Sequence, residues 1–168
     1  MGQGSHRAEG KGILAVDETV PTLTKRFDAL KIASTDDSCR TYREMFFTTP
    51  GATAFISGAI LYDETIRQKS SSGTPLADVL AKQGILPGIK VDTGAKTLAG
   101  SPDEKITEGL DGLRERLKEY RELGARFAKW RAVIRITDVP QPNVYKRQRP
   151  RAGEVRSALS GGPNCANR

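Results

Sequence analysis

Four short apolar segments, each separated from the next by a segment of helical character, constrain the fold of this chain more than any other feature. They are residues 12–16, 54–61, 85–92 and 127–136. Each is rich in β-branched or other apolar residues and is bounded by polar or turn-forming residues, so each is predicted to be a strand. Because helices separate the strands, parallel pairing through right-handed crossovers is expected. The predicted fold class is therefore α/β.

The segments between the strands carry apolar residues at helical spacing. They are expected to form helices that bury Leu23, Phe27 and Leu30; Tyr42, Met45 and Phe46; Leu76, Val79 and Leu80; and Ile106, Leu110, Leu113, Leu117, Tyr120 and Leu123. Thr74 is expected to cap the third helix, with Pro75 in its first position and Gly84 at its end. A barrel of βα units and an open doubly wound sheet both fit this order. The chain has no Gly-rich loop after the first strand, which counts against a dinucleotide-binding fold.

The positive charge of the chain is concentrated near its C-terminus. Residues 143–168 contain six Lys or Arg and one Glu, a balance of +5 out of a net charge of +7. This part is rich in Pro, Gly and Arg and has no apolar periodicity, so we expect a disordered basic tail over 141–168. The α/β body is expected to span 11–140, after an irregular N-terminus over 1–10. Because the body is nearly neutral, nucleic acid is not an expected partner of it.

Composition also narrows the chemistry. No apolar run is long enough to span a bilayer, and the N-terminus lacks the apolar core of a signal peptide, so we expect a cytoplasmic protein with no membrane partner. Cys39 and Cys165 form no metal or redox spacing, and His6 is the only histidine. A His-rich zinc site is therefore excluded, and catalysis would use lysine, carboxylate or hydroxyl groups.

Charged residues gather at the downstream ends of the predicted strands: Asp17, Asp63, Lys90, Asp92, Lys129 and Arg131. That end of a (β/α) barrel carries the active site. Lys129 and Arg131 are predicted to project from one face of the last strand, where two cations call for an anionic ligand. For Asp63 and Asp92 we keep the simpler interpretation of a solvated loop charge or helix cap. The other four together favour a doubly phosphorylated sugar as ligand, with lysines suited to imine or proton-transfer chemistry.

Five blocks of the sequence, in order, resemble class I fructose-bisphosphate aldolases. They are residues 11–18, 58–65, 88–94, 108–113 and 127–131, and the resemblance runs from about residue 11 to about residue 140. It implies the first half, about four βα units, of a (β/α)8 TIM barrel that is usually a homotetramer and needs no metal or other cofactor. The implied reaction of glycolysis is cleavage of fructose 1,6-bisphosphate to dihydroxyacetone phosphate and glyceraldehyde 3-phosphate through a lysine Schiff base.

The resemblance also implies roles for individual residues. Asp17 matches the acid that orients proton transfer at the Schiff base, and Lys129 matches the lysine beside the imine nitrogen. Lys90 and Arg131 match cations that hold the substrate, chiefly at the phosphate remote from the Schiff base.

Hydroxyl residues of the family near that phosphate are matched by Thr19 and Thr22. The chain departs from the family pattern nearby, because Val20 and Pro21 replace a Thr-Gly pair that is common in animal members. Cys39 replaces an arginine of the family motif.

The Schiff-base lysine and the glutamate acid/base of the family belong to later barrel strands, so the chain as given is expected to lack both and to be inactive. We further hypothesise that both ends are translated out of frame. Permitted codons for 2–8 and 144–167, read one base later, spell segments similar to the family's neighbouring helices and fifth strand. Two alternatives stay open: a non-catalytic half-barrel whose basic tail binds nucleic acid or a membrane surface, and a fragment that pairs with another half-barrel through its open strand edges.

Overall fold

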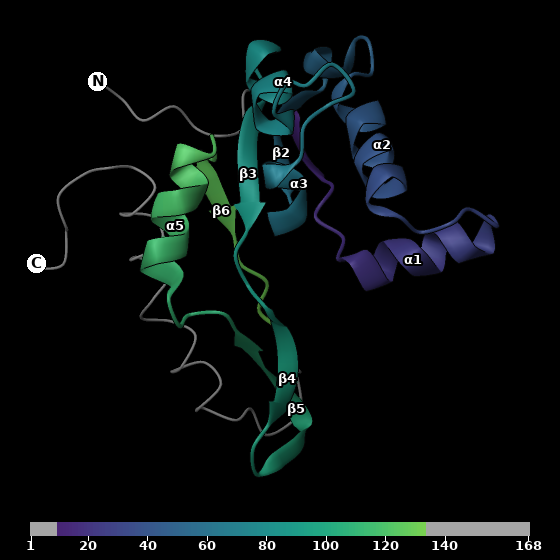
Figure 1. The fold of residues 1–168 in the computed structure, drawn as a ribbon. Coiled ribbons are helices and arrows are strands. Elements are labelled where there is room, and N and C mark those ends of the chain that lie inside the picture. The colour runs from purple at the N-terminus through teal and green to yellow at the C-terminus, as the bar shows by residue number, and fades with distance from the viewer. Residues whose placement is uncertain (1–9, 134–168) are drawn as a thin grey trace, which may run out of the picture.

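The computed structural model describes residues 10–133, which form a parallel sheet, a separate hairpin and the helices that connect them (Figure 1). The sheet contains β1 (Gly12–Ala15), β2 (Ile56–Leu61), β3 (Leu86–Lys90) and β6 (Phe127–Lys129). The helices are α1 (Val20–Ala29), α2 (Asp36–Phe47), the 3-10 helix η1 (Ala52–Ala54), α3 (Asp63–Arg67), α4 (Leu76–Lys82) and α5 (Leu113–Glu122). None of the helices in this part of the chain has the length and apolarity that a bilayer crossing requires.

The four strands are parallel and lie side by side in chain order, β1-β2-β3-β6. The strand order of a doubly wound sheet reverses beside its first strand, whereas the strands of a (β/α) barrel follow one another around the wall. The observed order is therefore that of a barrel wall. The prediction of an α/β fold with parallel strands is confirmed.

The main hydrophobic core lies between the sheet and helices α3, α4 and α5. Its members include Ala59, Leu61 and Ile89 from the strands, which are all fully buried. Leu76 and Leu117 pack into the same cluster from the helices. Burial of these side chains between the strands and the helices is what holds the connecting helices against the sheet.

A β-hairpin occupies the region where the sequence predicted the beginning of a long helix. β4 (Gly94–Leu98) and β5 (Ser101–Glu108) pair antiparallel and extend away from the parallel sheet (Figure 1). Ile106, which we expected on the helical stripe, lies in β5. Gly109 and Gly112 have φ angles of 116° and 61°, outside the right-handed helical region, so the helix begins only at Leu113.

Two residues predicted to face inward from the first helices are exposed instead. Leu30 is 69% exposed because α1 ends at Ala29 and the chain turns through Lys31 at a φ of 56°. Met45 is 55% exposed, because α2 buries the stripe formed by Cys39, Arg43 and Phe47.

The boundaries of other elements also differ from the prediction. β2 begins at Ile56, and Phe55 before it is 73% exposed. β6 ends at Lys129, so residues 130–133 are not strand, and 134–136 lie outside the described residues, as do the predicted tail and most of the predicted N-terminal segment. Pro75, rather than Thr74, occupies the cap position of α4.

Helices α1 and α2 form an arm on one side of the sheet (Figure 1). Leu23 and Phe27 of α1 pack against Cys39 of α2 in a small cluster of their own, with Tyr42 beside it. Cys39 is 3% exposed, so it is part of an apolar contact between the two helices. This arm meets the sheet at the turn that follows β1.

A buried arginine ties the arm to that turn. Arg43 is 2% exposed and forms an ion pair with the Glu18 carboxylate. It also donates a hydrogen bond of 2.6 Å to the Glu18 backbone oxygen. Arg26 pairs with the same carboxylate from α1, where its side chain is 52% exposed. Burial opposes ionisation of Glu18, but the bonds from Arg43 and Arg26 outweigh it and lower the pKa of Glu18.

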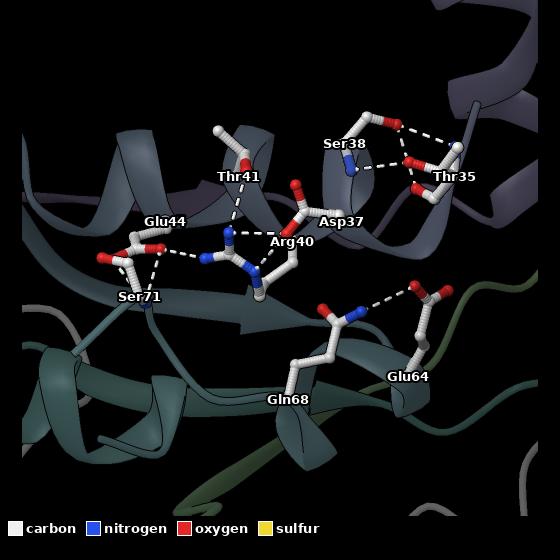
Figure 2. Close-up of polar contacts among 9 residues, drawn as sticks. All are labelled: Thr35, Asp37, Ser38, Arg40, Thr41, Glu44, Glu64, Gln68 and Ser71. Carbon is white, nitrogen blue, oxygen red and sulfur yellow. Dashed lines mark hydrogen bonds and ion pairs between the residues drawn. The ribbon is translucent and has the colours of Figure 1, made fainter. Parts of the chain in front are cut away.

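Figure 2 shows a second polar network, which fastens α2 to the loop between α3 and α4. Thr35 and Ser38 form a capping box at the start of α2. Arg40 bonds to Asp37 at 2.8 Å and pairs with Glu44. Glu44 in turn accepts hydrogen bonds from the Ser71 backbone NH at 3.0 Å and from the Ser71 hydroxyl at 2.7 Å. The arm is thus held at two places that are distant in sequence.

We predict that Gly88→Ala destabilises the sheet. Gly88 is the register partner of Phe127, and a Cβ at residue 88 would overlap the Phe127 ring. The free energy of unfolding should fall by about 2 kcal/mol, as for other overpacked cores, in urea denaturation. Gly12→Ala is the matched control, because its Cβ would meet nothing nearer than the Phe55 oxygen at 3.9 Å. Equal destabilisation by both variants would contradict this prediction.

We also predict that Arg43→Met costs about 3 kcal/mol at pH 7, because it leaves a largely buried carboxylate without its buried partner. Arg26→Met should cost much less, since that arginine is half exposed. The pKa of Glu18 is lowered on folding, so its contribution is present above the ordinary value of 4.5 and is lost as the pH falls through the folded-state pKa. The difference in the free energy of unfolding between wild type and Arg43→Met should therefore become smaller at acidic pH. Thermal unfolding from pH 7 to pH 3 would measure it, and a constant difference would refute the role of the ion pair.

Candidate active site

The register of the sheet places the predicted site residues at one level. Lys90 and Lys129 are register partners at the ends of β3 and β6. Ala15 is level with Ile60, and Leu61 with Ile89. Continuing both registers past the strand ends puts Asp17 level with Tyr62, and Tyr62 level with Lys90. In-register residues of parallel strands project to the same face. Asp17, Tyr62, Lys90 and Lys129 therefore form one row along the downstream edge of the sheet.

The two ends of this row are joined by an ion pair. The Lys129 ammonium donates to the Asp17 carboxylate, although the residues are 112 positions apart in sequence. Asp17 follows β1 and Lys129 ends β6, and these two outer strands would be about 14 Å apart in a flat sheet. The contact is therefore made across the concave side of a curved sheet. Asp17 is 8% exposed, and the Lys129 side chain is 31% exposed, so the pair remains accessible from the lysine side.

Lys90 is held by an aspartate two residues further along. Its ammonium donates to the Asp92 carboxylate at 2.6 Å and to the Asp92 backbone oxygen at 2.7 Å. The Asp92 side chain is only 2% exposed. Asp92 is thus a buried ion-pair partner, and our interpretation of it as a solvated loop charge was wrong.

Arg131 lies beyond the end of β6 and is exposed. Its backbone NH donates to the Asp92 carboxylate at 3.3 Å, and its backbone oxygen accepts a bond of 2.7 Å from the Thr107 hydroxyl. The strand alternation that we used to pair Arg131 with Lys129 does not apply, because residues 130–133 are not strand. Arg131 is nevertheless brought to the same edge of the sheet by Asp92.

A cavity of about 490 Å³ opens beside Lys90. Its lining residues come from the ends of β2 and β3, from α3 and α5, and from the residues at the starts of α1, β4 and α5: Thr19, Tyr62, Asp63, Arg67, Lys90, Asp92, Thr93, Gly94, Asp111, Arg116, Glu119 and Tyr120. Thr19 contributes from the start of α1, and its hydroxyl lies 3.1 Å from that of Thr22. The structure therefore groups Thr19 with Thr22 and with Lys90, whereas Asp17 and Lys129 form their ion pair outside the lining of this cavity.

The residues that α3 and α5 contribute to the cavity form a network of paired charges. Asp63 accepts from Arg67 at 2.9 Å and from the Tyr120 hydroxyl at 2.8 Å, and Arg67 also bonds to Glu119 at 2.5 Å. Burial opposes ionisation of Asp63, but the bonds from Arg67 and Tyr120 prevail and lower its pKa. Burial, together with the bond to Asp63, raises the pKa of Tyr120. Asp63 is the first residue of α3, after its cap residue Tyr62, and its side chain is half exposed. It is therefore neither the solvated loop charge nor the helix cap that we expected.

The arrangement can bind an anion and move protons. It presents two lysine ammonium groups in register, an accessible carboxylate–ammonium pair and the hydroxyls of Thr19 and Thr22. Cations and hydroxyls at strand ends are donors suited to phosphate oxygens, and a carboxylate beside an ammonium can exchange a proton with a substrate. Among residues 10–133, no group of three or more His, Cys, Asp or Glu side chains could hold a metal ion.

Three residues of this region were not predicted from the sequence. They are Asp92, which binds the Lys90 ammonium, Tyr62, which lies in the row of strand-end residues, and Arg43, which pairs with Glu18. Tyr62 could have been identified from its position, because it comes directly after the second predicted strand, as Asp17 comes directly after the first. Nothing local indicated Arg43, because an arginine on a helix is usually solvated.

Comparison with known proteins adds the family. Residues 5–148 match the family model described as class-I fructose-bisphosphate aldolase. The chain is 60% identical over 134 residues to a "Probable fructose-bisphosphate aldolase class 1" of Xanthomonas campestris, covering 79% of this chain and 40% of that protein. It is 56% identical over 129 residues to fructose-bisphosphate aldolase 1 of Toxoplasma gondii, covering 77% and 36%. It is 54% identical over 127 residues to the cytosolic fructose-bisphosphate aldolase 6 of Arabidopsis thaliana, covering 76% and 36%.

The fold agrees with that family. A solved structure of fructose-bisphosphate aldolase from Plasmodium falciparum, in complex with TRAP and a small-molecule inhibitor, superposes with a TM-score of 0.83 at 43% identity. The superposition covers 89% of this chain and 45% of that one. The chain spans about 40% of the length of the curated relatives it matches, so its sheet corresponds to part of their TIM barrel. From the family match, the identities and the shared fold, we conclude that this chain belongs to the class I fructose-bisphosphate aldolase family.

Proposed function

We propose that this chain carries the first half of a class I fructose-bisphosphate aldolase site, the part that recognises the phosphorylated sugar and assists the chemistry at its carbonyl. The observation that carries the proposal is the Lys129–Asp17 ion pair, which brings together the two predicted catalytic residues from the downstream ends of the two outer strands. An ion pair on a solvated surface adds little stability, so a gain in stability alone does not explain this contact. The ion pair lies at the downstream edge of the barrel wall, which is where (β/α) barrels carry their active sites.

In the proposed reaction, fructose 1,6-bisphosphate is cleaved to dihydroxyacetone phosphate and glyceraldehyde 3-phosphate. The Lys129 ammonium assists loss of water from the carbinolamine by donating a proton to the departing hydroxyl. The Asp17 carboxylate orients that lysine and the substrate hydroxyls through hydrogen bonds. Both groups act from the ends of strands, which hold them in fixed positions.

Four residues would hold the substrate. Lys90 has one N–H donor left after its two bonds to Asp92, and we propose that this donor and the Arg131 guanidinium bind the phosphate remote from the imine. Thr19 and Thr22, whose hydroxyls are adjacent, would complete that phosphate site.

We infer that the imine-forming lysine and the glutamate acid/base of the family lie outside these 168 residues, since the chain corresponds to the first part of its relatives. The resemblance implies a homotetramer, and we propose this assembly and a cytoplasmic location for the enzyme to which this chain corresponds. The word "cytosolic" in the name of the Arabidopsis relative is consistent with the location.

The substrate-binding proposal predicts that the 168-residue chain binds fructose 1,6-bisphosphate through Lys90 and Arg131. Lys90→Met and Arg131→Met should each weaken binding about tenfold, the loss expected for one charge-assisted hydrogen bond. Isothermal titration calorimetry would measure the dissociation constants. Lys82→Met is the matched control, because Lys82 is exposed in the last turn of α4, next to the upstream end of β3. Unchanged affinity in both test variants would disprove the proposed phosphate site.

A separate experiment addresses the imine. Treatment with dihydroxyacetone phosphate and sodium borohydride should leave the 168-residue chain unlabelled, because borohydride traps only a lysine imine. Mass spectrometry of the intact chain would detect the adduct, with a full-length class I aldolase as the positive control. A stable adduct on this chain would overturn the inference that the Schiff-base lysine lies elsewhere.

A further inference from the structure

The Asp92 carboxylate bonds to separate parts of the site at once. One carboxylate oxygen accepts from the Lys90 ammonium at 2.6 Å and from the Gly94 backbone NH at 3.2 Å. The other oxygen accepts from the Arg131 backbone NH at 3.3 Å. The Asp92 side chain is 2% exposed, so its carboxylate is shielded from water and bonds to protein groups instead.

The bonds to Lys90 restrict a side chain that would otherwise be mobile. A free lysine side chain loses conformational entropy when it is ordered. In this structure the Lys90 ammonium is held by both the carboxylate and the backbone oxygen of Asp92. A ligand that binds Lys90 therefore meets a side chain that is already ordered, with the remaining N–H donor free of the Asp92 bonds.

The bond to Arg131 restricts a segment that the sheet does not hold. β6 ends at Lys129, so Arg131 has no strand partner. Its peptide groups are instead held on two sides, with the NH bonded to Asp92 and the oxygen to the Thr107 hydroxyl of β5. Thr107 is 5% exposed, and the hairpin that carries it follows directly from the Asp92 turn. The position of the Arg131 backbone thus depends on Asp92 and on the hairpin.

We propose that Asp92 is a positioning residue that couples Lys90 to Arg131, so that the two cations act as one phosphate-binding unit. The proposal rests on the function proposed above for these cations. It also predicts an effect of neutralising Asp92 on ligand affinity that is opposite to the effect expected from charge repulsion alone. A carboxylate beside a phosphate site repels the ligand, so its neutralisation should tighten binding. If Asp92 acts by positioning, the same change loosens both cations and weakens binding.

The test is the affinity of the 168-residue chain for fructose 1,6-bisphosphate. Asp92→Asn keeps the size of the side chain and removes its charge, and it should weaken binding about tenfold, as loss of a charge-assisted bond at either cation would. It should also shift the Gly94 and Arg131 backbone amide resonances in 15N NMR spectra, since both amides donate to the carboxylate. In a chain that already carries Lys90→Met and Arg131→Met, Asp92→Asn should change the affinity less than about twofold, because its effect runs through those two cations.

Thr107→Val provides a second variant that leaves Lys90 and its aspartate intact. It removes only the hydroxyl bonded to the Arg131 oxygen, and it should weaken binding about threefold, in keeping with the loss of one neutral hydrogen bond. Asp37→Asn is the control, because Asp37 is an exposed carboxylate on α2 that pairs with Arg40. Thermal unfolding of every variant shows whether the fold survives, so that an unfolded Asp92→Asn chain leaves Thr107→Val as the deciding variant.

The outcomes separate the two proposals. If Lys90→Met and Arg131→Met weaken binding while Asp92→Asn tightens it or leaves it unchanged, the positioning role is overturned and the phosphate site stands. If Asp92→Asn unfolds the chain and Thr107→Val leaves binding unchanged, the positioning role is also overturned. If neither cation variant weakens binding, the proposed phosphate site is overturned, and the positioning role of Asp92, which depends on that site, is overturned with it.

Discussion

Parallel pairing in chain order is the constraint on which the rest of this structure depends. Each strand adds to the same edge of the sheet, so residues at equal offsets from successive strands end at one level. Lys90 and Lys129 are level because of this register, and curvature of the sheet then lets Lys129 reach Asp17. A slip of one residue in any strand would turn its side chains to the opposite face and separate the row.

Buried ionic contacts hold the loops that carry the site. Arg43 fixes the turn that follows Asp17, and Asp92 fixes both the end of β3 and the segment after β6. Removing one partner from such a contact is costly because the other is left buried without compensation. These contacts therefore give the loops at the downstream ends of the strands a rigidity that exposed ion pairs would not provide. The apolar core positions the strands, and the buried ion pairs position what projects from their ends.

The sequence was informative where a pattern is local. Apolar runs bounded by turn residues located all four strands of the parallel sheet, and helical spacing located α4 and α5, which pack on it. The short helix α3 was not predicted. Predictions were wrong where tertiary contacts decide. Leu30 and Met45 have the right spacing to be buried, but no neighbouring element within residues 10–133 covers them. The hairpin over β4 and β5 was missed because its burial is slight and its alternation is weak, so helical spacing at Leu110, Leu113 and Leu117 was extended too far upstream.

What the sequence determined by itself was the α/β class, the parallel pairing of the strands and the charged residues that follow the strand ends, because strand length, periodicity and the residues after each strand can all be read along the chain. The order of the strands, which distinguishes a barrel wall from a doubly wound sheet, came from the structure. Only the tertiary structure decided which charges meet. Asp17 pairs with Lys129 across 112 residues, Arg43 is buried against Glu18, and Asp92 holds Lys90 and Arg131 together. The physical reason is that the energy of an ionic contact depends on the distance and burial of its partners, and both arise only when the sheet has curved and the loops have closed.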